Sequence, residues 1–385
     1  MEFNNRLNKV DFSGISKMIN KANALGSDLI RLEIGDVDFD PPASIFEGIS
    51  LAFQKQKTHY PAFRGDPILV ECIIKWLREY SDIEVSSEQI LITAGGSMAL
   101  YLSLQSILNL DDEVLLPTPV WPHLEAMIYL AGGVQKPIIL SSENGFHLDF
   151  EALKKSVTHK TKAELINAPN NPTGTIYTKS EMIELSKFAD AHNLVIISDE
   201  EYEAFCYNEK SICSPIQFYN KTIVCRSFSK SFSMSGLRLG YIIAPTDWIP
   251  IISKCNFYSS MYNSSIVQSA VTNALINSRD FVTNLVATYK KRMIHVVNSL
   301  NMIKGVKCSL SEGGIYVWPD FREITDDDVM LANFLLEKAG IVTVPGSVFG
   351  EAGGGFLRIS LACSDANIDK ALQKIKDFIP QLTKK

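Results

Sequence analysis

Short apolar runs alternate with longer amphipathic stretches through the middle of this chain, and no other feature limits its fold as strongly. The runs are rich in Val and Ile and lie at residues 90–93, 113–116, 163–167, 194–198, 222–225 and 239–243. Continuous apolar runs of this kind are typical of parallel strands that are covered on both faces. Helical stretches such as 98–109 and 180–192 lie between them. The alternation therefore predicts an α/β sheet with helices on both faces.

The pattern changes after about residue 270, which indicates a second domain. Beyond it come helical stretches at 278–300, 326–339 and 365–378 and strand-like runs at 314–318 and 356–360. A chain of 385 residues also exceeds what one compact core usually holds. We expect an N-terminal arm and part of the small domain at 1–44, a large domain at 45–272 and a smaller α+β domain at 273–385. The first ~45 residues either pack against the small domain or reach a partner subunit.

Composition excludes several classes of protein. A net charge of −6 argues against non-specific nucleic-acid binding, which needs a basic face. No apolar run approaches the ~20 residues of a membrane span, and the start of the chain has no apolar stretch of signal-peptide length. The seven cysteines form no CxxC pair, which fits reduced thiols in a cytoplasmic protein. The six histidines have no metal-ligand spacing, so we expect no metal site.

Lys230 stands in a Ser-rich segment at 227–240, and Arg238 follows it eight positions later. The segment contains no acid that could pair with either cation. A lysine without a counterion loses proton affinity in partly apolar surroundings, because desolvation disfavours its charged form. A neutral amine is what a Schiff-base lysine needs. A solvated lysine in a Ser-rich loop is the alternative, and the segment alone leaves both open.

Two loops that follow predicted strands are candidate ligand contacts. Gly95, Gly96 and Ser97 follow the run at 90–93 and open a helix, whose first N–H groups attract anions. The loop at 167–174 contains two prolines and a glycine, which would hold Asn171 rigidly. In open α/β sheets, ligands bind beyond the carboxyl ends of the strands. A plain structural turn is the alternative for each loop.

Two charged residues belong to predicted strands. Asp199 comes directly off the run at 194–198 and is placed for a cation, whereas the acids after it could start a solvated helix. Arg358 lies inside the apolar run at 356–360 and must find an anion there. A protein carboxylate or a substrate carboxylate would suit its planar guanidinium equally well.

Four motifs occur together in a specific order: Asn-Pro-Thr-Gly at 171–174, Asp-x-x-Tyr at 199–202, Ser-x-x-Lys at 227–230 with an arginine eight residues later, and Leu-Arg-Ile-Ser at 357–360. This set resembles the pyridoxal-phosphate-dependent aminotransferases of fold type I, in class I/II of the aspartate aminotransferase superfamily. The resemblance runs from about Gly35 to Arg358. It implies a large domain with a mostly parallel seven-stranded sheet and a smaller α+β domain, in a homodimer.

The resemblance also implies a role for each matching residue. Lys230 would bind pyridoxal 5'-phosphate as a Schiff base and act as general base, with Asp199 and Tyr202 as further catalytic residues. Asp199 would keep the pyridine nitrogen protonated, so that the ring can act as an electron sink. The cofactor-binding residues would be Gly96, Ser97, Trp121, Asn171, Asp199, Tyr202, Ser227, Lys230, Arg238 and, across the subunit interface, Tyr60. The substrate-binding residues would be Gly35, Asn171 and Arg358. Trp121 could instead be a plain core residue.

The reaction that we expect is transamination between an L-amino acid and a 2-oxo acid. Aspartate-specific members of the family carry a second arginine in the stretch that corresponds to 256–263, and this chain has none there. Phe and Tyr in that stretch favour a neutral, aromatic or polar substrate over an acidic one. Specificity could also come from 11–19, or from Asp36 and Asp38 for a basic substrate. Two alternatives are a C–S lyase (β-eliminase) or decarboxylase that uses the same site, and a non-catalytic relative that senses an amine.

Overall fold

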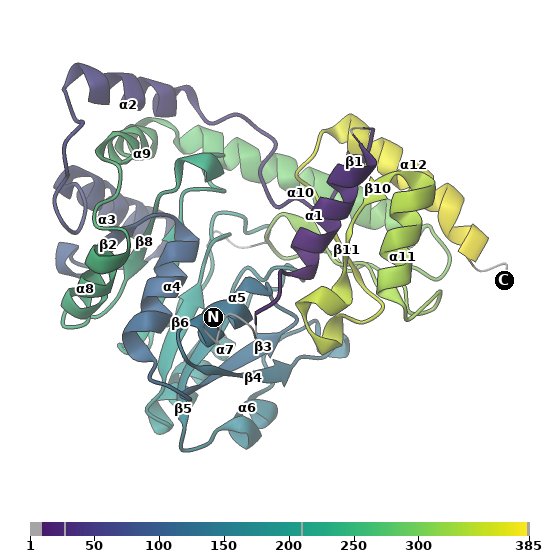
Figure 1. Cartoon of the computed structure of the whole chain (residues 1–385), viewed down its shortest axis with the longest axis horizontal. Helices are drawn as coiled ribbons and strands as arrows, with labels where there is room; N and C mark the ends of the chain where they lie inside the picture. Colours follow the sequence, from purple (N-terminus) through teal and green to yellow (C-terminus); the bar gives the residue numbers. More distant parts are fainter. Residues whose placement is uncertain (1–9, 27, 209–210, 383–385) are drawn as a thin grey trace, which may run out of the picture.

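A seven-stranded sheet forms the centre of the computed structural model, which describes residues 10–26, 28–208 and 211–382 (Figure 1). Its strands are β2 (Ile90–Thr93), β3 (Glu113–Thr118), β4 (Val134–Ile139), β5 (Thr161–Asn167), β6 (Val195–Asp199), β7 (Thr222–Ser227) and β8 (Gly240–Ile243). Their order is β2-β8-β7-β6-β5-β3-β4. The pairs from β7 to β4 are parallel, whereas β8 runs antiparallel to both of its neighbours. The predicted mostly parallel seven-stranded sheet is confirmed.

Strand β4 is the member of this sheet that the apolar pattern did not indicate. It lies at the sheet edge and pairs with β3 alone. Its residues include Gln135, Lys136 and Pro137, and most of its side chains are only partly buried. An edge strand with a partly exposed face does not need the continuous apolar run of a central strand, and it tolerates proline.

Helices cover both faces of the sheet, as the alternation predicts. On one face lie α4 (Gly96–Ile107), α5 (His123–Leu130) and α8 (Ile249–Ser259), which share a core with Leu165 and Ile197. On the other face lie α2 (Ala43–Gln54), α3 (Pro67–Ser81), α6 (Phe150–Ser156), α7 (Lys179–Ala191) and α9 (Ser265–Asn277). Side chains of one strand alternate between the two cores, as the period of two requires. The predicted α/β layering is therefore present.

The C-terminal part of the chain builds two smaller sheets. It contains α10 (Arg279–Asn301), β9 (Tyr316–Val317), α11 (Asp328–Phe334) with a π-helical continuation at Leu335–Ala339, β10 (Ile341–Val342), β11 (Val344–Pro345), β12 (Leu357–Ser360) and α12 (Asp365–Leu382). Strands β11, β12 and β9 form one antiparallel sheet. Figure 1 shows α10 extending from the helices beside the large sheet to the C-terminal elements.

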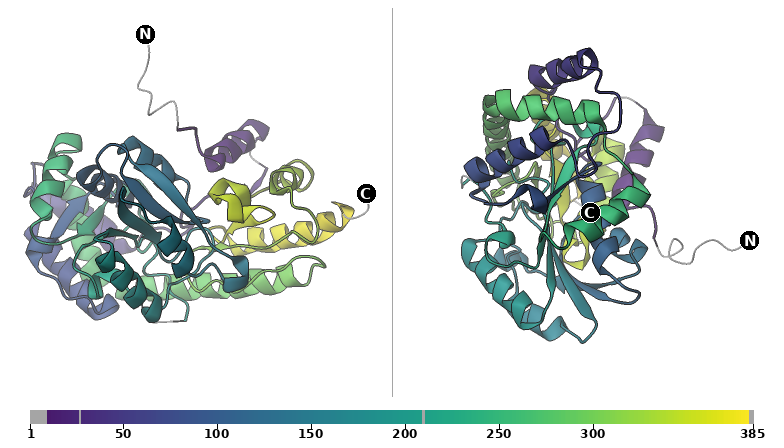
Figure 2. Two further views of the ribbon diagram at one scale, coloured as in Figure 1. Left: turned by 90° about the horizontal axis from the view of Figure 1, so that it is seen from below. Right: turned by 90° about the vertical axis from the view of Figure 1, so that its left-hand side faces the viewer.

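The N-terminal segment packs on these C-terminal elements. Strand β1 (Ile30–Arg31) pairs with β10 in parallel, and Met18 and Ala22 of α1 (Gly14–Leu25) share the C-terminal core. The left view of Figure 2 shows α1 beside the C-terminal helices. Of the two expected positions for this segment, packing on the small domain is present. The domain boundaries at residues 44 and 272 remain a prediction. No helix in the described ranges has both the length and the apolar composition of a membrane span.

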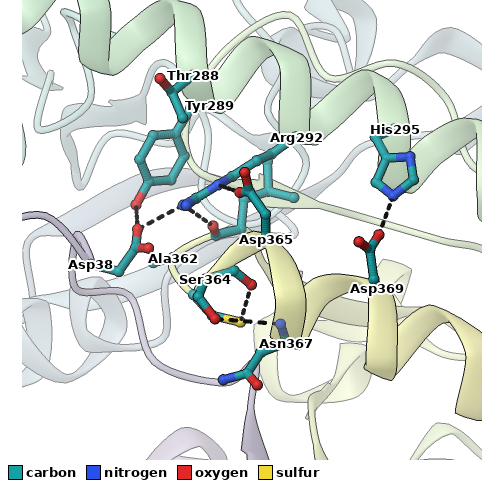
Figure 3. A network of polar contacts seen from close by, with 12 residues as sticks. Asp38, Thr288, Tyr289, Arg292, His295, Ala362, Ser364, Asp365, Asn367 and Asp369 are labelled. Carbon is teal, nitrogen blue, oxygen red and sulfur yellow. Dashed lines mark hydrogen bonds and ion pairs between the residues drawn. The ribbon is translucent and has the colours of Figure 1, made fainter.

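A buried arginine fixes the loop that follows β1 (Figure 3). Asp38 accepts hydrogen bonds from the Tyr289 hydroxyl at 2.8 Å and from Arg292 Nη1 at 2.7 Å. Arg292 Nε donates to Asp365 at the start of α12 at 2.6 Å, and Nη1 also donates to the Leu361 carbonyl. Asp38 is therefore already paired within the chain, and its role toward a basic substrate remains a hypothesis.

Glu164 of β5 is an unpaired acid in the core beneath α7. It is fully buried, and neither carboxyl oxygen has a hydrogen-bond partner. Burial raises the pKa of Glu164 to about 8. Because the folded protein then binds more protons than the unfolded chain between pH ~4.5 and ~8, this acid lowers stability progressively as pH rises through that window.

Replacing Glu164 with methionine should therefore stabilise the cofactor-free protein. We expect the free energy of unfolding to rise by about 3 kcal/mol at pH 7 and to change little below pH ~4. Urea denaturation at several pH values measures this effect. Glu184→Gln, an exposed change on α7, should leave the wild-type pH dependence in place. If the Glu164→Met protein lost as much stability between pH 4 and 8 as the wild type does, the raised pKa of Glu164 would be contradicted.

Candidate active site

A cavity of about 260 Å³ lies where strands of the large sheet end against the C-terminal elements. The predicted site residues that line it are Gly35, Gly96, Ser97, Trp121, Asn171, Asp199, Tyr202, Lys230, Arg238 and Arg358. Asn167 and Asp199 are paired in register at the carboxyl ends of β5 and β6. Parallel strands thus bring distant polar side chains to one edge, as expected for an open α/β sheet.

Two predicted residues do not line this cavity. Ser227 lies just behind it, where its hydroxyl donates to Ser229 Oγ at 2.9 Å, and Ser229 itself lines the cavity. Tyr60 is 76% exposed and stacks on Tyr262 with ring centroids 4.7 Å apart. It contributes nothing to the cavity of its own chain, and its predicted action across a subunit interface remains a prediction.

Asp199 is held in place by the backbone around it. Its Oδ1 accepts a hydrogen bond from the Glu201 N–H at 3.2 Å, and its carbonyl accepts one from the Asn167 side chain at 3.2 Å. Burial raises the pKa of Asp199 to about 8, and the negative charge of Glu201 adds to this rise. The carboxyl group is consequently protonated near neutral pH in the cofactor-free chain. A cation beside it would ionise it.

Lys230 and Gly35 meet in the cavity although they are distant in sequence. Lys230 Nζ donates a hydrogen bond to the Gly35 carbonyl at 2.6 Å. Among the residues that the structure describes, no carboxylate lies within ion-pair distance of this amine. A side chain at position 35 would collide with the Tyr316 hydroxyl, so only glycine fits there. The amine therefore points to a backbone carbonyl and stays free of a counterion.

Arg358 is 2% exposed and has no carboxylate partner in the described ranges. Its Nη2 donates to the Glu33 carbonyl at 2.5 Å and its Nη1 to Asn171 Oδ1 at 3.1 Å, while Nε has no partner. The guanidinium carbon lies 4.3 Å from the centre of the Tyr316 ring. Of the two anions that the sequence left open, a protein carboxylate is absent here. The buried charge is thus available to a carboxylate that enters the cavity.

Tyr202 and Tyr316 form a hydroxyl pair on one wall. Their oxygens are 2.9 Å apart, and burial with the Tyr316 neighbour holds the pKa of Tyr202 well above its usual value. The Tyr202 side chain is therefore a neutral hydrogen-bonding group. Tyr316 was not singled out in the sequence, because nothing in its local pattern distinguishes it from a core residue of β9. Asn171 is fixed by its N–H, which donates to Asn167 Oδ1 at 2.7 Å.

The N-terminus of α4 and Arg238 form a positive corner of the cavity. Gly95 caps α4 with φ +88°, a conformation that favours glycine, and a Cβ there would lie 2.6 Å from Arg238 Nη2. The free N–H groups of the first turn begin at Gly96. Together these groups have the chemistry of an anion site.

Glu201 lies in the same corner and was not expected there. Its carboxylate is beside Gly96, since a side chain at that position would collide with Glu201 Oε2, and it lines the cavity. It also hydrogen-bonds Ser227. The run of three acids at 199–201 was visible in the sequence, but the pattern alone did not show which acids face the cavity.

Part of the cavity lining is apolar. Ile15 and Ile19 of α1 line it together with Leu100 and Trp121. His123 joins them, with its ring 4.4 Å from that of Trp121 and nearly parallel to it. Its Nδ1 is buried without a partner, and burial lowers the pKa of His123. This wall offers an apolar surface and one neutral imidazole.

Comparisons with known proteins agree with the fold and with this cavity. Residues 27–375 match the family described as aminotransferase class I and II. The chain is 34% identical to an aspartate aminotransferase of Pyrococcus abyssi, over 98% of both chains, and 32% identical to aromatic-amino-acid aminotransferase 2 of Thermococcus litoralis, over 99% of both. The solved aspartate aminotransferase of Thermus thermophilus with maleate superposes with a TM-score of 0.93 at 33% identity, covering 98% of this chain and 100% of that one. The chain belongs to the class I and II aminotransferases. It is an enzyme of that family, with the predicted fold type I.

Proposed function

We propose that this aminotransferase uses pyridoxal 5'-phosphate, bound to Lys230 as a Schiff base, and acts on neutral, aromatic or polar L-amino acids and 2-oxo acids. The observation that carries the proposal is the meeting of three groups in one cavity. These are an amine without a counterion at Lys230, an acid at Asp199 and an unpaired buried guanidinium at Arg358. Each suits a different part of a cofactor–amino acid pair.

The residues present fit this cofactor. The first turn of α4, with Gly96 and Ser97, and Arg238 supply N–H groups and positive charge to a phosphate, and Ser227 lies behind them. Asp199 ionises opposite a ring nitrogen and keeps it protonated. The remaining ring contacts are proposed for Trp121, Tyr202, Asn171 and, from a second subunit, Tyr60. When bound, pyridoxal phosphate supplies the electron sink for a carbanion at the substrate α-carbon.

The chain's own groups then orient the substrate and move its proton. Arg358 binds the α-carboxylate, and Asn171 fixes that guanidinium from one side. The Lys230 amine would accept the proton from the substrate α-carbon and deliver it to the cofactor carbon on the far side of the substrate nitrogen. The Gly35 carbonyl holds the amine in the cavity by its hydrogen bond. Orientation and proton transfer thus come from residues that are far apart in sequence.

The lining of the cavity supports a substrate without a second carboxylate. Lys230, Arg238 and Arg358 already have proposed roles, and no further Lys or Arg of the described chain lines the cavity. Ile15, Ile19 and the imidazole of His123 instead offer apolar surface and one hydrogen-bonding nitrogen. A carboxylate buried there would lack a charged partner.

Exposed aromatic side chains support the proposed homodimer. Exposed Tyr60 stacks on Tyr262, and Phe63 and Phe257 contact Tyr262 and each other. Tyr60 could reach another chain from this surface. The cysteines are all free thiols, which supports a reducing cytoplasmic location.

A panel of amino acids tests the proposal. We expect the cofactor-loaded enzyme to react with phenylalanine, tyrosine or methionine at least ~10-fold faster in kcat/KM than with aspartate, because a buried unpaired carboxylate is costly. Loss of the visible absorption band and mass spectrometry of the 2-oxo acid follow the reaction. A clear preference for aspartate would overturn the substrate proposal. Release of pyruvate with ammonia or a thiol, and no 2-oxo acid from other substrates, would indicate elimination instead.

A further inference from the structure

Glu201 places a carboxylate among the groups proposed for the cofactor's phosphate. It lies against Gly96 at the N-terminus of α4 and hydrogen-bonds Ser227. Lys230 and Arg238 are the cations that act on it. Its carboxyl group therefore lies in the positive corner, where the two cations favour its charged form.

A phosphate dianion and an ionised Glu201 would compete for these groups. Like charges at contact distance in a site shielded from water repel strongly, and one of them is then neutralised. Both Arg238 and the N–H groups of α4 would remain the preferred partners of the phosphate, since they offer several charge-assisted hydrogen bonds. Neutralisation consequently falls on the carboxylate.

We propose that Glu201 takes up a proton from the solvent when a dianionic phosphate or sulfate group binds at the N-terminus of α4. This inference rests on the proposed function, because it assigns that corner to the phosphate. The proton attaches to a Glu201 carboxyl oxygen, no other bond changes, and the resulting hydroxyl can donate to the bound anion. Glu201 thereby links cofactor binding to pH.

The surroundings of Glu201 favour proton uptake when an anion binds. Burial raises the pKa of Glu201, while Lys230, the Ser227 hydrogen bond and Arg238 oppose the rise. A bound dianion cancels the effect of these cations and leaves burial unopposed. The first turn of α4, residues 96–99, carries no titratable side chain.

The remaining acids near Glu201 are neutral or paired. Burial raises the pKa of both Asp199 and Glu203 to about 8. Glu200 forms a buried ion pair with Arg226 at 2.8 Å. None of them contacts Gly96, so Glu201 is the acid placed to sense an anion there.

Sulfate is the probe for this proposal, because it keeps its two charges through the neutral and alkaline range. Titration calorimetry of the cofactor-free protein at pH 7, where Asp199 and Glu203 are mostly protonated, in buffers with different ionisation enthalpies, gives both the affinity and the protons taken up. We expect the wild type to take up close to one proton for each sulfate, and Glu201→Gln to take up almost none. The variant should bind sulfate about 10-fold more tightly, because it carries no charge to neutralise.

Glu203→Gln is the matched control, since it makes the same change two residues away on a side chain that does not line the cavity. It should retain the wild-type proton uptake. Glu201→Ala gives a second test should Glu201→Gln fold poorly, and it should also lose the uptake. Unchanged affinity and uptake in a folded Glu201 variant would overturn the inference.

Loading with pyridoxal phosphate separates this inference from the proposed function. A visible absorption band in the wild type, together with unchanged sulfate binding in both Glu201 variants, would overturn the inference alone. The absence of a band in the wild type would overturn the proposed function. Sulfate binding with Glu201-linked proton uptake would then still show that the positive corner binds a dianion.

Discussion

Replacing Lys230 with alanine should lower kcat by about 10⁴-fold or more, because one side chain is proposed to bind the cofactor covalently and to move the substrate proton. The Lys230 amine is the group of the cavity that donates to the Gly35 carbonyl and has no carboxylate partner. Alanine leaves the positive corner at the N-terminus of α4 intact, so the variant should still bind the cofactor without a covalent bond. Steady-state assays with the best amino acid of the panel measure the loss.

Two further variants make this result specific. Lys230→Arg keeps the charge but not the nucleophile, and it should lose activity to a similar degree. Lys187→Ala removes an exposed lysine from α7 and should leave kcat unchanged. Near wild-type turnover in Lys230→Ala would contradict the assignment of both roles.

Asp199→Asn should lower kcat by about 10³-fold, because a neutral amide cannot keep a ring nitrogen protonated. Asparagine can still accept the hydrogen bond that Glu201 N–H donates to Asp199 Oδ1, so the local geometry should survive. Pre-steady-state absorbance with one amino acid measures the chemical step directly. A variant that binds cofactor and reacts at the wild-type rate would show that Asp199 has no part in the chemistry.

Stability separates folding from chemistry in this variant. Burial holds the pKa of Asp199 near 8, above its unfolded value, so the cofactor-free wild type loses stability as pH rises from ~4 to ~8. Asp199→Asn removes that loss, and its free energy of unfolding at pH 8 should be no lower than that of the wild type. A large loss of activity without a loss of stability would therefore be a direct effect.

The central sheet was predictable from sequence because its strands are buried on both faces. Runs such as 194–197 are continuous and apolar, which distinguishes them from the amphipathic helices beside them. β4 did not follow this rule, since an edge strand with Lys136 and Pro137 resembles a loop in composition. The short β1 and β10 depend on pairing between chain segments that are far apart, which no local pattern shows.

The site was predictable where a residue follows directly from its strand or motif. Asp199 and Arg358 are examples, because a charge at the end of or within an apolar strand requires a partner. His123, Tyr316 and Glu201 could not be found in this way. Their relevance comes from the other segments that the fold brings beside them, and each has an ordinary structural reading in its own stretch. The pairing of Asp38 could not be predicted either, because its partner Arg292 lies in a helix that is distant in the sequence.

The cavity combines Ile15 and Ile19 of α1 with Arg358 of β12, so its wall uses both ends of the chain. During synthesis, Lys230 and Asp199 emerge well before the strand that carries Arg358. A growing chain therefore has the amine proposed to react before it has the guanidinium proposed to bind the substrate carboxylate, and bringing both into one cavity needs long-range closure. Competence to react with an amino acid should accordingly arise only after β12 has been synthesised and has joined the fold.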